Sequence, residues 1–241
     1  NLWSELMERL PKVSKVENAR RRFDLAIVSV LLDAGAGPNW RYSDKKTGIV
    51  QGRSEGLAIA SIRLLESGLL SLHGEDEPFR VDAEALRKLS VEKLGEVFQV
   101  SAVNPLLGLD NRTNLLNRLG SALLKKSEMF CRDGTSRPGN LFDYLSKKQV
   151  EGAVEARDIL IALLHGIGHI WPDGEWLGDI PIGDAGHHSS LVRDDITNKI
   201  IPFHKLSQWM TYSLIEPLEE SGVRVINLDD LTGLPEYRNG G

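Results

Sequence analysis

Apolar residues recur along most of this chain at the three-to-four-residue spacing typical of α-helices. Residues 13–36 begin with polar and basic side chains and become almost wholly apolar over residues 25–32, where only Ser29 interrupts the run. A helix that is apolar on all faces is a buried helix, so we expect its second half to lie in the protein core. Gly35 and Gly37 predict the end of this helix.

The same spacing predicts further helices, separated by capping and turn residues. Ser54, Asp82, Ser90 and Asp110 have the short polar side chains typical of helix N-caps. The predicted helices cover residues 54–67, 82–89, 90–98, 110–124, 142–148, 153–164 and 203–221, the last with a kink at Pro217. Residues 38–52 are expected to form an exposed loop that contains Trp40 and Tyr42, and residues 131–139 a second loop.

Glycine and proline crowd residues 165–195, where the helical spacing stops. We expect an irregular segment there, with at most one short β-hairpin around residues 176–182, and an extended piece at residues 223–226. The regular alternation of strands and helices that a parallel sheet needs is missing from the pattern. The sequence therefore predicts a mainly α fold with a small irregular or β-hairpin segment near residues 170–185.

The pattern contains no internal repeat and no shift in composition that marks a domain boundary. We therefore expect residues 1–241 to form a single, mostly helical domain. The chain opens at Asn1 rather than at a methionine and stops at Gly240-Gly241. This predicts a fragment of a longer protein that extends beyond both ends.

Charge and cysteine content narrow the expected partners and compartment. The 29 lysines and arginines against 34 aspartates and glutamates give a formal net charge of −5, which disfavours a nucleic-acid binder. The apolar runs fall well short of the roughly 18 residues that indicate a membrane span, so no membrane association is expected. A single cysteine, Cys131, excludes an internal disulfide and favours a reducing compartment such as the cytoplasm. We expect a small-molecule substrate.

Motifs for the common cofactors are absent from the sequence. There is no P-loop, no HExxH, and Gly166-Ile167-Gly168 lacks both the third glycine and the preceding strand of a dinucleotide fingerprint. His187 and His188 are adjacent, so their rings diverge on regular structure, and a solvated glycine-rich loop is favoured over a metal site. No cofactor and no metal are therefore expected.

Three segments carry polar residues that interrupt apolar helices or crowd one loop. In the first, Asp33 ends the buried helix, and Arg53, Ser54 and Glu55 start the next helix. A buried acid is unfavourable unless it is paired or functional. A cation beside the free N–H groups of a helix N-terminus suits a phosphate or carboxylate. The alternative is a structural ion pair between Asp33 and Arg53.

The second segment places Lys205, Gln208 and Tyr212 on one helix face, at positions i, i+3 and i+7. A cation, an amide and a phenol on one face could bind a sugar phosphate or a ureide. The alternative is an amphipathic helix with a solvated polar stripe.

The third segment is residues 231–241, where Glu236, Arg238 and Asn239 crowd a turn. A single Glu-Tyr-Arg tripeptide is a short signal, because charged residues also gather in exposed loops. The alternative is therefore an exposed loop without a function.

These segments also resemble a known family, the uracil-catabolism protein four family of fungi and bacteria. The resemblance rests on the stretches FDLAIVSVLLDAGAG, WRY with TG and RSEGLA, FQVS with NPLLGL, RPGNLFDYL, PFHKLSQWMTYSLIEPLEE and LTGLPEYRNGG. It covers residues 23–241. It implies a role in uracil degradation through a uridine nucleotide and a ribosylurea intermediate to urea, a route that needs a step cleaving a ribose–nitrogen bond.

A second, shorter resemblance is to the queuosine-salvage nucleotide N-glycosylases. Residues 205–208, KLSQ, and 231–238, LTGLPEYR, are similar to the KRAQ helix and the later LTxxADYRxPQ segment of those enzymes. Their helical fold is similar to that of helix–hairpin–helix DNA glycosylases. The motif's acid is Glu236 here instead of Asp, and the acid near the end of the KRAQ helix falls on Ser213.

The two resemblances together imply an N-ribosyl hydrolase that acts on a phosphorylated riboside. A carboxylate can stabilise the oxocarbenium-like transition state or deprotonate the attacking water, and Glu236 is the first candidate and Asp33 the second. The expected substrate-binding residues are Arg53, Lys205 and Arg238 for a 5′-phosphate, Gln208 and Asn239 for urea or base, Trp40, Tyr42, Trp209 and Tyr237 for the ring, with Ser54, Glu55 and Tyr212 beside them.

Three other classes of protein stay open at this point. A non-catalytic ligand-binding or regulatory module of the same pathway needs the pocket but not the acid. A uridine-nucleotide ring hydrolase usually needs a metal site, for which the sequence shows no ligand cluster. A DNA glycosylase rests on fold analogy alone, and the acidic net charge argues against it.

Overall fold

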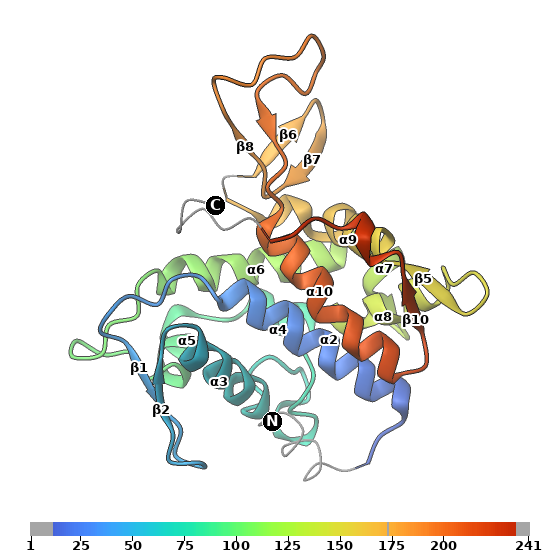
Figure 1. Cartoon of the computed structure of the whole chain (residues 1–241). Helices are drawn as coiled ribbons and strands as arrows, with labels where there is room; N and C mark the ends of the chain where they lie inside the picture. Colours follow the sequence, from blue (N-terminus) through green and yellow to red (C-terminus); the bar gives the residue numbers. More distant parts are fainter. Residues whose placement is uncertain (1–11, 173, 235–241) are drawn as a thin grey trace.

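The computed structural model describes residues 12–172 and 174–234, and these residues form a mainly helical protein, as the sequence pattern predicts (Figure 1). The helices are α2 (Lys15–Leu32), α3 (Arg53–Glu66), α4 (Ala83–Arg87), α5 (Val91–Val97), α6 (Leu109–Lys125), α7 (Ser127–Phe130), α8 (Leu141–Ser146), α9 (Ala156–Ile167) and α10 (Lys205–Glu220). Short 3₁₀ turns lie at η1 (Gly74–Asp76), η2 (Pro138–Asn140), η3 (Gly168–Ile170) and η4 (Leu228–Asp230). Buried apolar side chains from Ala19 to Leu231 form a continuous hydrophobic core.

Helix α2 is the central element of this core. It packs against α3, α6, α8 and α10, and Figure 1 shows it running beside α10 through the middle of the molecule. Phe23, Ile27 and Leu31 recur at the four-residue spacing of one helix face and are buried, which confirms the predicted core position. Ser14 caps the start of the helix, and the helix ends at Leu32, before the glycines that predicted its end.

Residues 38–52 do not form the exposed loop that the sequence predicts. Strands β1 (Arg41–Ser43) and β2 (Val50–Gly52) pair antiparallel, and the side chains of Trp40 and Tyr42 are 0% and 5% exposed. The Trp40 ring stacks on Phe98 with centroids 6.2 Å apart, and its Nε1–H donates to the Phe98 carbonyl oxygen at 2.9 Å. Burial of two large aromatic rings therefore outweighs the polar character of the surrounding sequence.

Helix α3 begins earlier than the capping pattern predicts. Gly52, rather than Ser54, is the N-cap, and Arg53 opens the helix with a φ of 51°. A Cβ on Gly56 would lie 2.6 Å from the Gln51 carbonyl oxygen and 3.0 Å from the Trp40 ring. Only a glycine fits this approach, so the hairpin packs tightly on α3 and fixes Ser54 in its first turn.

Capping residues set the starts of the next helices, though not all as predicted. Ser90 caps α5 as expected, and its Oγ accepts a backbone N–H at 3.3 Å. Asp82 lies at the N-cap of α4, but its buried carboxylate accepts the Leu72 N–H at 2.9 Å instead of capping the helix. Gly108, with a φ of 71°, precedes α6, so Asp110 lies inside the first turn of α6 and is not its cap.

Short strand pairs account for two further differences from the prediction. In the predicted loop at residues 131–139, β3 (Cys131–Arg132) and β4 (Thr135–Ser136) form a hairpin across Asp133-Gly134, whose φ angles of 49° and 77° suit a two-residue turn. Strand β5 (Ala153–Glu155) pairs in parallel with β10 (Arg224–Ile226). This pairing confirms the predicted extended piece at 223–226 and delays the start of α9 to Ala156.

The irregular segment near residues 170–185 is confirmed, and it contains the predicted hairpin. Strands β6 (Glu175–Leu177) and β7 (Ile180–Gly183) pair antiparallel, as do β8 (Gly186–His187) and β9 (Ile200–Ile201). Figure 1 shows these strands projecting above the helical body. Helix α10 follows them and carries Pro217 inside, where the sequence predicts a kink. None of the helices in the described ranges is long and apolar enough to span a membrane.

Candidate active site

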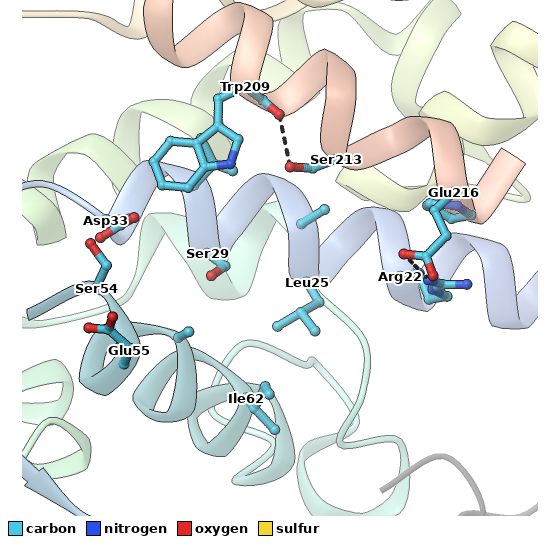
Figure 2. Close-up of a pocket in the computed structure, with 14 residues that line it drawn as sticks. Arg22, Leu25, Ser29, Asp33, Ser54, Glu55, Ile62, Trp209, Ser213 and Glu216 are labelled. Atoms are coloured by element: carbon cyan, nitrogen blue, oxygen red, sulfur yellow. Dashed lines mark hydrogen bonds and ion pairs between the residues drawn. The ribbon is translucent and has the colours of Figure 1, made fainter. Parts of the chain in front are cut away.

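A cavity of about 500 Å³ lies between α2, α3 and α10 (Figure 2). It forms because α2 packs against both of the other helices, which brings together residues far apart in the sequence. Its lining residues are Arg22, Leu25, Ala26, Ser29, Val30, Asp33, Ser54, Glu55, Ala58, Ile62, Trp209, Ser213, Glu216 and Pro217. A largely apolar trough with a few polar groups, of this volume, is typical of a site for a small molecule.

One end of the cavity contains Asp33, Ser54, Glu55 and Trp209, four of the residues that the sequence singles out. Asp33 is half-buried directly after α2, while Ser54 and Glu55 are exposed in the first turn of α3. Figure 2 shows the Asp33 carboxylate and the Ser54 side chain pointing toward one another beneath the Trp209 ring. The two carboxylates and the hydroxyl can accept hydrogen bonds from the hydroxyl groups of a sugar, and the carboxylates can stabilise a positive charge. The indole can cover the face of a ring.

Arg112 holds the backbone that presents Asp33. Its guanidinium is buried in α6, with the residue only 4% exposed. It donates hydrogen bonds to four backbone carbonyl oxygens, those of Leu32, Ala34, Gly35 and Leu107. Burial lowers the pKa of Arg112, while the nearby charge of Asp33 raises it. The turn after α2 is therefore fixed by one side chain from another helix.

The sequence analysis missed Arg112, although the pattern contains a signal for it. Arg112, Leu116, Leu119 and Leu123 lie at i, i+4, i+7 and i+11, so they share one helix face, and all four are buried. An arginine at a core position of an amphipathic helix needs partners inside the protein. The spacing shows the requirement, but only the tertiary structure supplies the carbonyl groups.

The far end of the cavity carries an ion-paired arginine that the sequence did not single out. Arg22 Nη2 lies 2.9 Å from Glu216 Oε2, and Arg22 is also paired with Glu220 (Figure 2). Ser213 also lines the cavity, and its Oγ donates to the Trp209 carbonyl oxygen at 2.8 Å. Glu216, three residues further along α10, is the carboxylate of this helix that lines the cavity.

Gln208 and Tyr212 do not form the open ligand-binding face that their spacing suggests. Gln208 is 3% exposed; its Nε2 donates to the Thr232 hydroxyl oxygen and its Oε1 accepts the Thr232 N–H at 3.0 Å. The Tyr212 hydroxyl donates to the Thr232 carbonyl oxygen at 2.9 Å. Both side chains therefore bind Thr232 of the protein itself, and their contact with substrate stays a prediction.

Lys205 opens α10, but the N-terminus of this helix is occupied by an internal acid. The Asp184 carboxylate accepts the Leu206 N–H at 2.8 Å and the Ser207 N–H at 3.4 Å. An acid in this position satisfies the free N–H groups that a phosphate would use. The contact of Lys205 with a substrate phosphate stays a prediction, and the N–H groups of Leu206 and Ser207 already bind Asp184.

The other predicted residues lie away from the cavity or outside the described residues. Trp40 and Tyr42 are core residues of the β1–β2 segment and are not among the residues that line the cavity, so their role of covering a ligand stays a prediction. Arg53 is exposed at the first residue of α3, directly before the cavity-lining Ser54. Four candidates lie outside the described residues, namely Glu236, Tyr237, Arg238 and Asn239.

Histidine and acidic side chains in the described ranges do not gather into a metal site. No group of three or more His, Cys, Asp or Glu side chains there has an arrangement that could hold a metal ion. His187 instead lies 2.9 Å from Glu175, between the Nδ1 and Oε1 atoms, on the projecting strands. His188 Nδ1 accepts the Ser190 N–H at 3.3 Å.

The fold and the cavity define a helical protein with a cavity between α2, α3 and α10 that two carboxylates, a serine and a tryptophan line at one end. The chain belongs to the DUF1688 family, described as "Protein of unknown function (DUF1688)", whose family model matches residues 1–241.

Two relatives confirm the resemblance found in the sequence. "Uracil catabolism protein 4" of Lachancea kluyveri is 41% identical over 242 residues, which cover 95% of this chain and 54% of that protein. "Protein urg3" of Schizosaccharomyces pombe is 41% identical over 245 residues, which cover 99% of this chain and 56% of that protein. The chain thus spans about half the length of the curated relatives it matches.

Proposed function

We propose that the protein acts in uracil catabolism and that the cavity between α2, α3 and α10 binds a phosphorylated riboside whose ribose–nitrogen bond is hydrolysed. The printed name of the Lachancea kluyveri relative supports the pathway. The observation that carries the activity is the meeting of Asp33, Ser54, Glu55 and Trp209 at one end of a small-molecule cavity. Asp33 directly follows α2, Ser54 and Glu55 lie in the first turn of α3, and Trp209 lies on α10, so the packing of three helices brings these residues to one cavity.

In this proposal the substrate lies with its ribose at the Asp33 end. The bond between C1′ and the urea nitrogen breaks, water adds to C1′, and the leaving nitrogen gains a proton, so that urea and ribose 5-phosphate are the products. A carboxylate stabilises the positive charge on the ribose and takes the proton of the water. Asp33 is the candidate within the described residues. Glu236, the first candidate from the sequence, stays a proposal.

Glu236 fits this proposal because of what Gln208 and Tyr212 do. They hold Thr232 with three hydrogen bonds, on the helix that also supplies Trp209 to the cavity. Glu236 follows Thr232 by only four residues. We therefore propose that Gln208 and Tyr212 hold the chain at Thr232, while Glu236 itself lies outside the described residues.

The N-terminus of α3 is our candidate for the substrate phosphate. Gly52 is its N-cap and supplies no side-chain hydrogen bond, and Arg53 is exposed at the first helical residue. Free N–H groups and an adjacent guanidinium are favourable for a phosphate. Lys205 and Arg238 stay further candidates, and a likeness to the helical fold of DNA glycosylases stays part of the proposal.

The test uses the full-length protein with ribosylurea 5′-phosphate, ribosylurea and a panel of nucleoside monophosphates. Release of urea or free base is followed by mass spectrometry. We expect release from one phosphorylated substrate, with D33N and E236Q each reducing kcat by at least about 100-fold, because both remove a carboxylate from the reacting centre. D110N and E96Q make the same chemical changes on exposed positions of α6 and α5 and should keep full activity.

Three other outcomes would change the proposal. Saturable binding of one compound without any turnover would favour a ligand-binding module of the same pathway. Full activity in D33N would remove Asp33 from the chemistry, and full activity in E236Q would remove Glu236. The third outcome concerns protein from which metal ions have been removed. If that protein is inactive and regains activity when a divalent cation is added, the result would favour a uridine-nucleotide ring hydrolase instead.

A further inference from the structure

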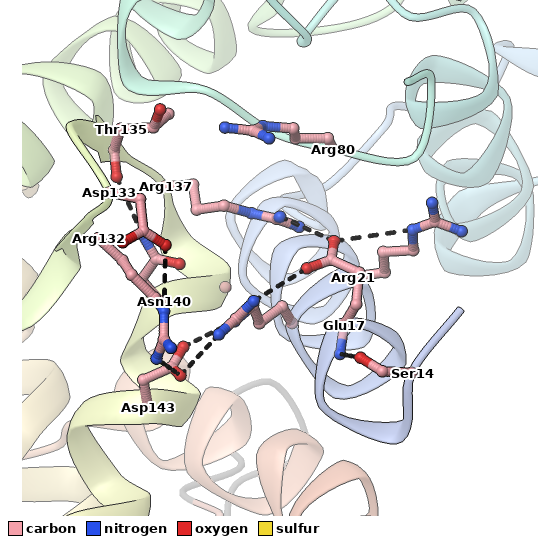
Figure 3. Close-up of polar contacts among 12 residues, drawn as sticks. Ser14, Glu17, Arg21, Arg80, Arg132, Asp133, Thr135, Arg137, Asn140 and Asp143 are labelled. Atoms are coloured by element: carbon pink, nitrogen blue, oxygen red, sulfur yellow. Dashed lines mark hydrogen bonds and ion pairs between the residues drawn. The ribbon is translucent and has the colours of Figure 1, made fainter. Parts of the chain in front are cut away.

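A second, smaller cavity of about 240 Å³ lies on another face of α2 (Figure 3). It is bounded by α2, by the segment that precedes α4, and by the β3–β4 hairpin with η2. Its lining residues are all polar or charged, namely Glu17, Arg20, His73, Arg80, Arg132, Asp133, Thr135, Arg137 and Asn140. Four arginines and a histidine line this one small cavity. Charged side chains away from water need hydrogen-bond acceptors, so a cavity with this lining is suited to a ligand that accepts hydrogen bonds.

This cavity is separate from the candidate active site. Successive residues of an α-helix are about 100° apart, which places Glu17 and Arg20 on one side of α2 and Arg22 and Ser29 on the opposite side. The first pair lines the small cavity, and the second pair lines the large one. A ligand in the small cavity therefore could not be part of a substrate in the large one.

The buried acids beside this cavity are fewer than the arginines that share them. Glu17 serves three arginines: Arg137 Nη1 at 2.9 Å, Arg20 Nη1 at 3.2 Å and Arg21 Nε at 3.8 Å. Its two oxygens do not satisfy them all, since the Arg21 Nε and Nη1 atoms are buried without a hydrogen-bond partner among the described residues.

The remaining acids are already shared or lie in water. Asp143 pairs with both Arg20 and Arg132, and Asp24 pairs with Arg137. Thus Arg20, Arg21, Arg132 and Arg137 share three buried or half-buried acids, Glu17, Asp24 and Asp143. Asp133 has a side chain that is 92% exposed and 3.5 Å from Arg132, so water and salt screen its charge.

Arg80 faces the same space from another segment and has hydrogen-bonding capacity to spare. Its Nε and Nη1 donate to Asp82 and Glu77 at 2.7 and 3.0 Å, while its Nη2 has no hydrogen bond to any described residue. Figure 3 shows the Arg80 guanidinium directed across the gap toward Thr135. The Nη2 of Arg132 and the Thr135 hydroxyl are likewise without a described hydrogen-bond acceptor.

The walls of this cavity are rigid. Arg137 is 3% exposed and its guanidinium is held by Asp24 and Glu17. Asp24 also accepts the Gly139 N–H at 2.6 Å, and the Asn140 Nδ2 donates to the carbonyl oxygens of Phe130 and Thr135 at 2.8 and 3.0 Å. A pre-organised wall of this kind keeps the donors in place before a ligand arrives.

We propose that this cavity is a binding site for a tetrahedral oxyanion, a phosphate group that is either free or carried by a small metabolite. Arg80, Arg132 and Thr135 donate to its oxygens, and the guanidinium groups of Arg20 and Arg137 lie in the wall around them. The planar guanidinium group presents paired N–H donors that match phosphate geometry. The site is independent of the function proposed for the large cavity.

The test is isothermal titration calorimetry, which measures the binding of inorganic phosphate, sulfate and ribose 5-phosphate to the full-length protein. We expect saturable binding of phosphate and sulfate that weakens by at least about tenfold in R132Q and in R80Q, because each change removes a charge-assisted donor. R132Q is the safer variant, since the Arg132 side chain is 47% exposed and Asp143 keeps Arg20 as a partner. T135V removes one hydroxyl donor without changing the charge and should weaken binding less.

R53Q is the matched control because it removes an arginine beside the large cavity. Phosphate binding that survives in R53Q and weakens in R132Q supports the proposal, and weaker binding of ribose 5-phosphate in the same variant indicates a metabolite site. Binding that is lost in R53Q but unchanged in R132Q and R80Q assigns the anion to the large cavity and overturns the proposal. Absence of saturable binding of either inorganic anion at millimolar concentration overturns it as well.

Discussion

Replacing Arg112 by methionine tests how the turn after α2 is held. Methionine keeps most of the aliphatic volume of the side chain and removes every donor. Four carbonyl oxygens lose a hydrogen bond, and the one at Leu32, with an N···O distance of 3.0 Å, is buried. The other three are partly buried, so water can replace the guanidinium there.

The expected loss of stability follows from these environments. An unpaired buried acceptor costs about 1–3 kcal/mol, and each partly buried one about 0.5 kcal/mol. The burial of a charged guanidinium is itself unfavourable, as the lowered pKa of Arg112 indicates, and its removal offsets part of the loss. We expect R112M to lower the free energy of unfolding by about 2–4 kcal/mol, equivalent to a fall in Tm of about 5–15 °C.

Urea denaturation at neutral pH, followed by far-UV circular dichroism, measures this change. R118M is the control, because Arg118 lies on the same helix, is exposed, and within the described residues makes one hydrogen bond, to the His169 carbonyl oxygen at 3.4 Å. The control should change the free energy of unfolding by less than about 0.5 kcal/mol. An R112M protein as stable as R118M would refute the argument that Arg112 holds this turn.

Three further predictions concern the packing and the buried charges. G56A should lower the free energy of unfolding by about 2 kcal/mol in thermal melts, since its Cβ would meet the Gln51 carbonyl oxygen at 2.6 Å; an unchanged Tm would contradict it. Burial raises the pKa of Asp24 to about 6, although Arg137 acts to lower it. Between about pH 4 and pH 6, the native state therefore keeps a proton on Asp24 that the unfolded chain has released. Asp24 therefore makes stability fall as pH rises from about 4 to about 6, and D24N should remove that component in urea titrations at several pH values. Hydrogen bonds from Arg63 lower the pKa of Asp44 to about 2, so its contribution is present above about pH 4 and is lost as pH falls toward 2; D44N should flatten the acid limb of the stability profile, and an unchanged limb would exclude Asp44 as its source.

The local pattern was sufficient for the helices and for part of the candidate site. Apolar spacing located α2, α6 and α10, and the density of glycine located the projecting strands, because these signals lie within a few residues of one another. Asp33 stood out because it ends an apolar helix, Ser54 because it is a candidate N-cap, and Trp209 because its ring can cover a ligand. All three line the large cavity.

The pattern failed where a distant segment supplies the stabilising contact. Trp40 lies in a polar stretch, and its core position depends on Phe98. Gln208 lies on a plausible ligand-binding face, and its buried position depends on Thr232. In each case the partner is at least 24 residues away along the chain, and the spacing within one segment contains no information about it.

The sequence by itself determined the helical class, the family resemblance and the residue types available for chemistry, since these depend on local spacing and on residue identity. Only the tertiary structure decided which of those residues share a cavity, because that depends on how α2, α3 and α10 pack. It also decided that Asp33 is presented by Arg112 and that arginines on the opposite side of α2 surround a second cavity. A buried charge must be neutralised or hydrogen-bonded, and the partners that do this come from whichever elements the packing brings near.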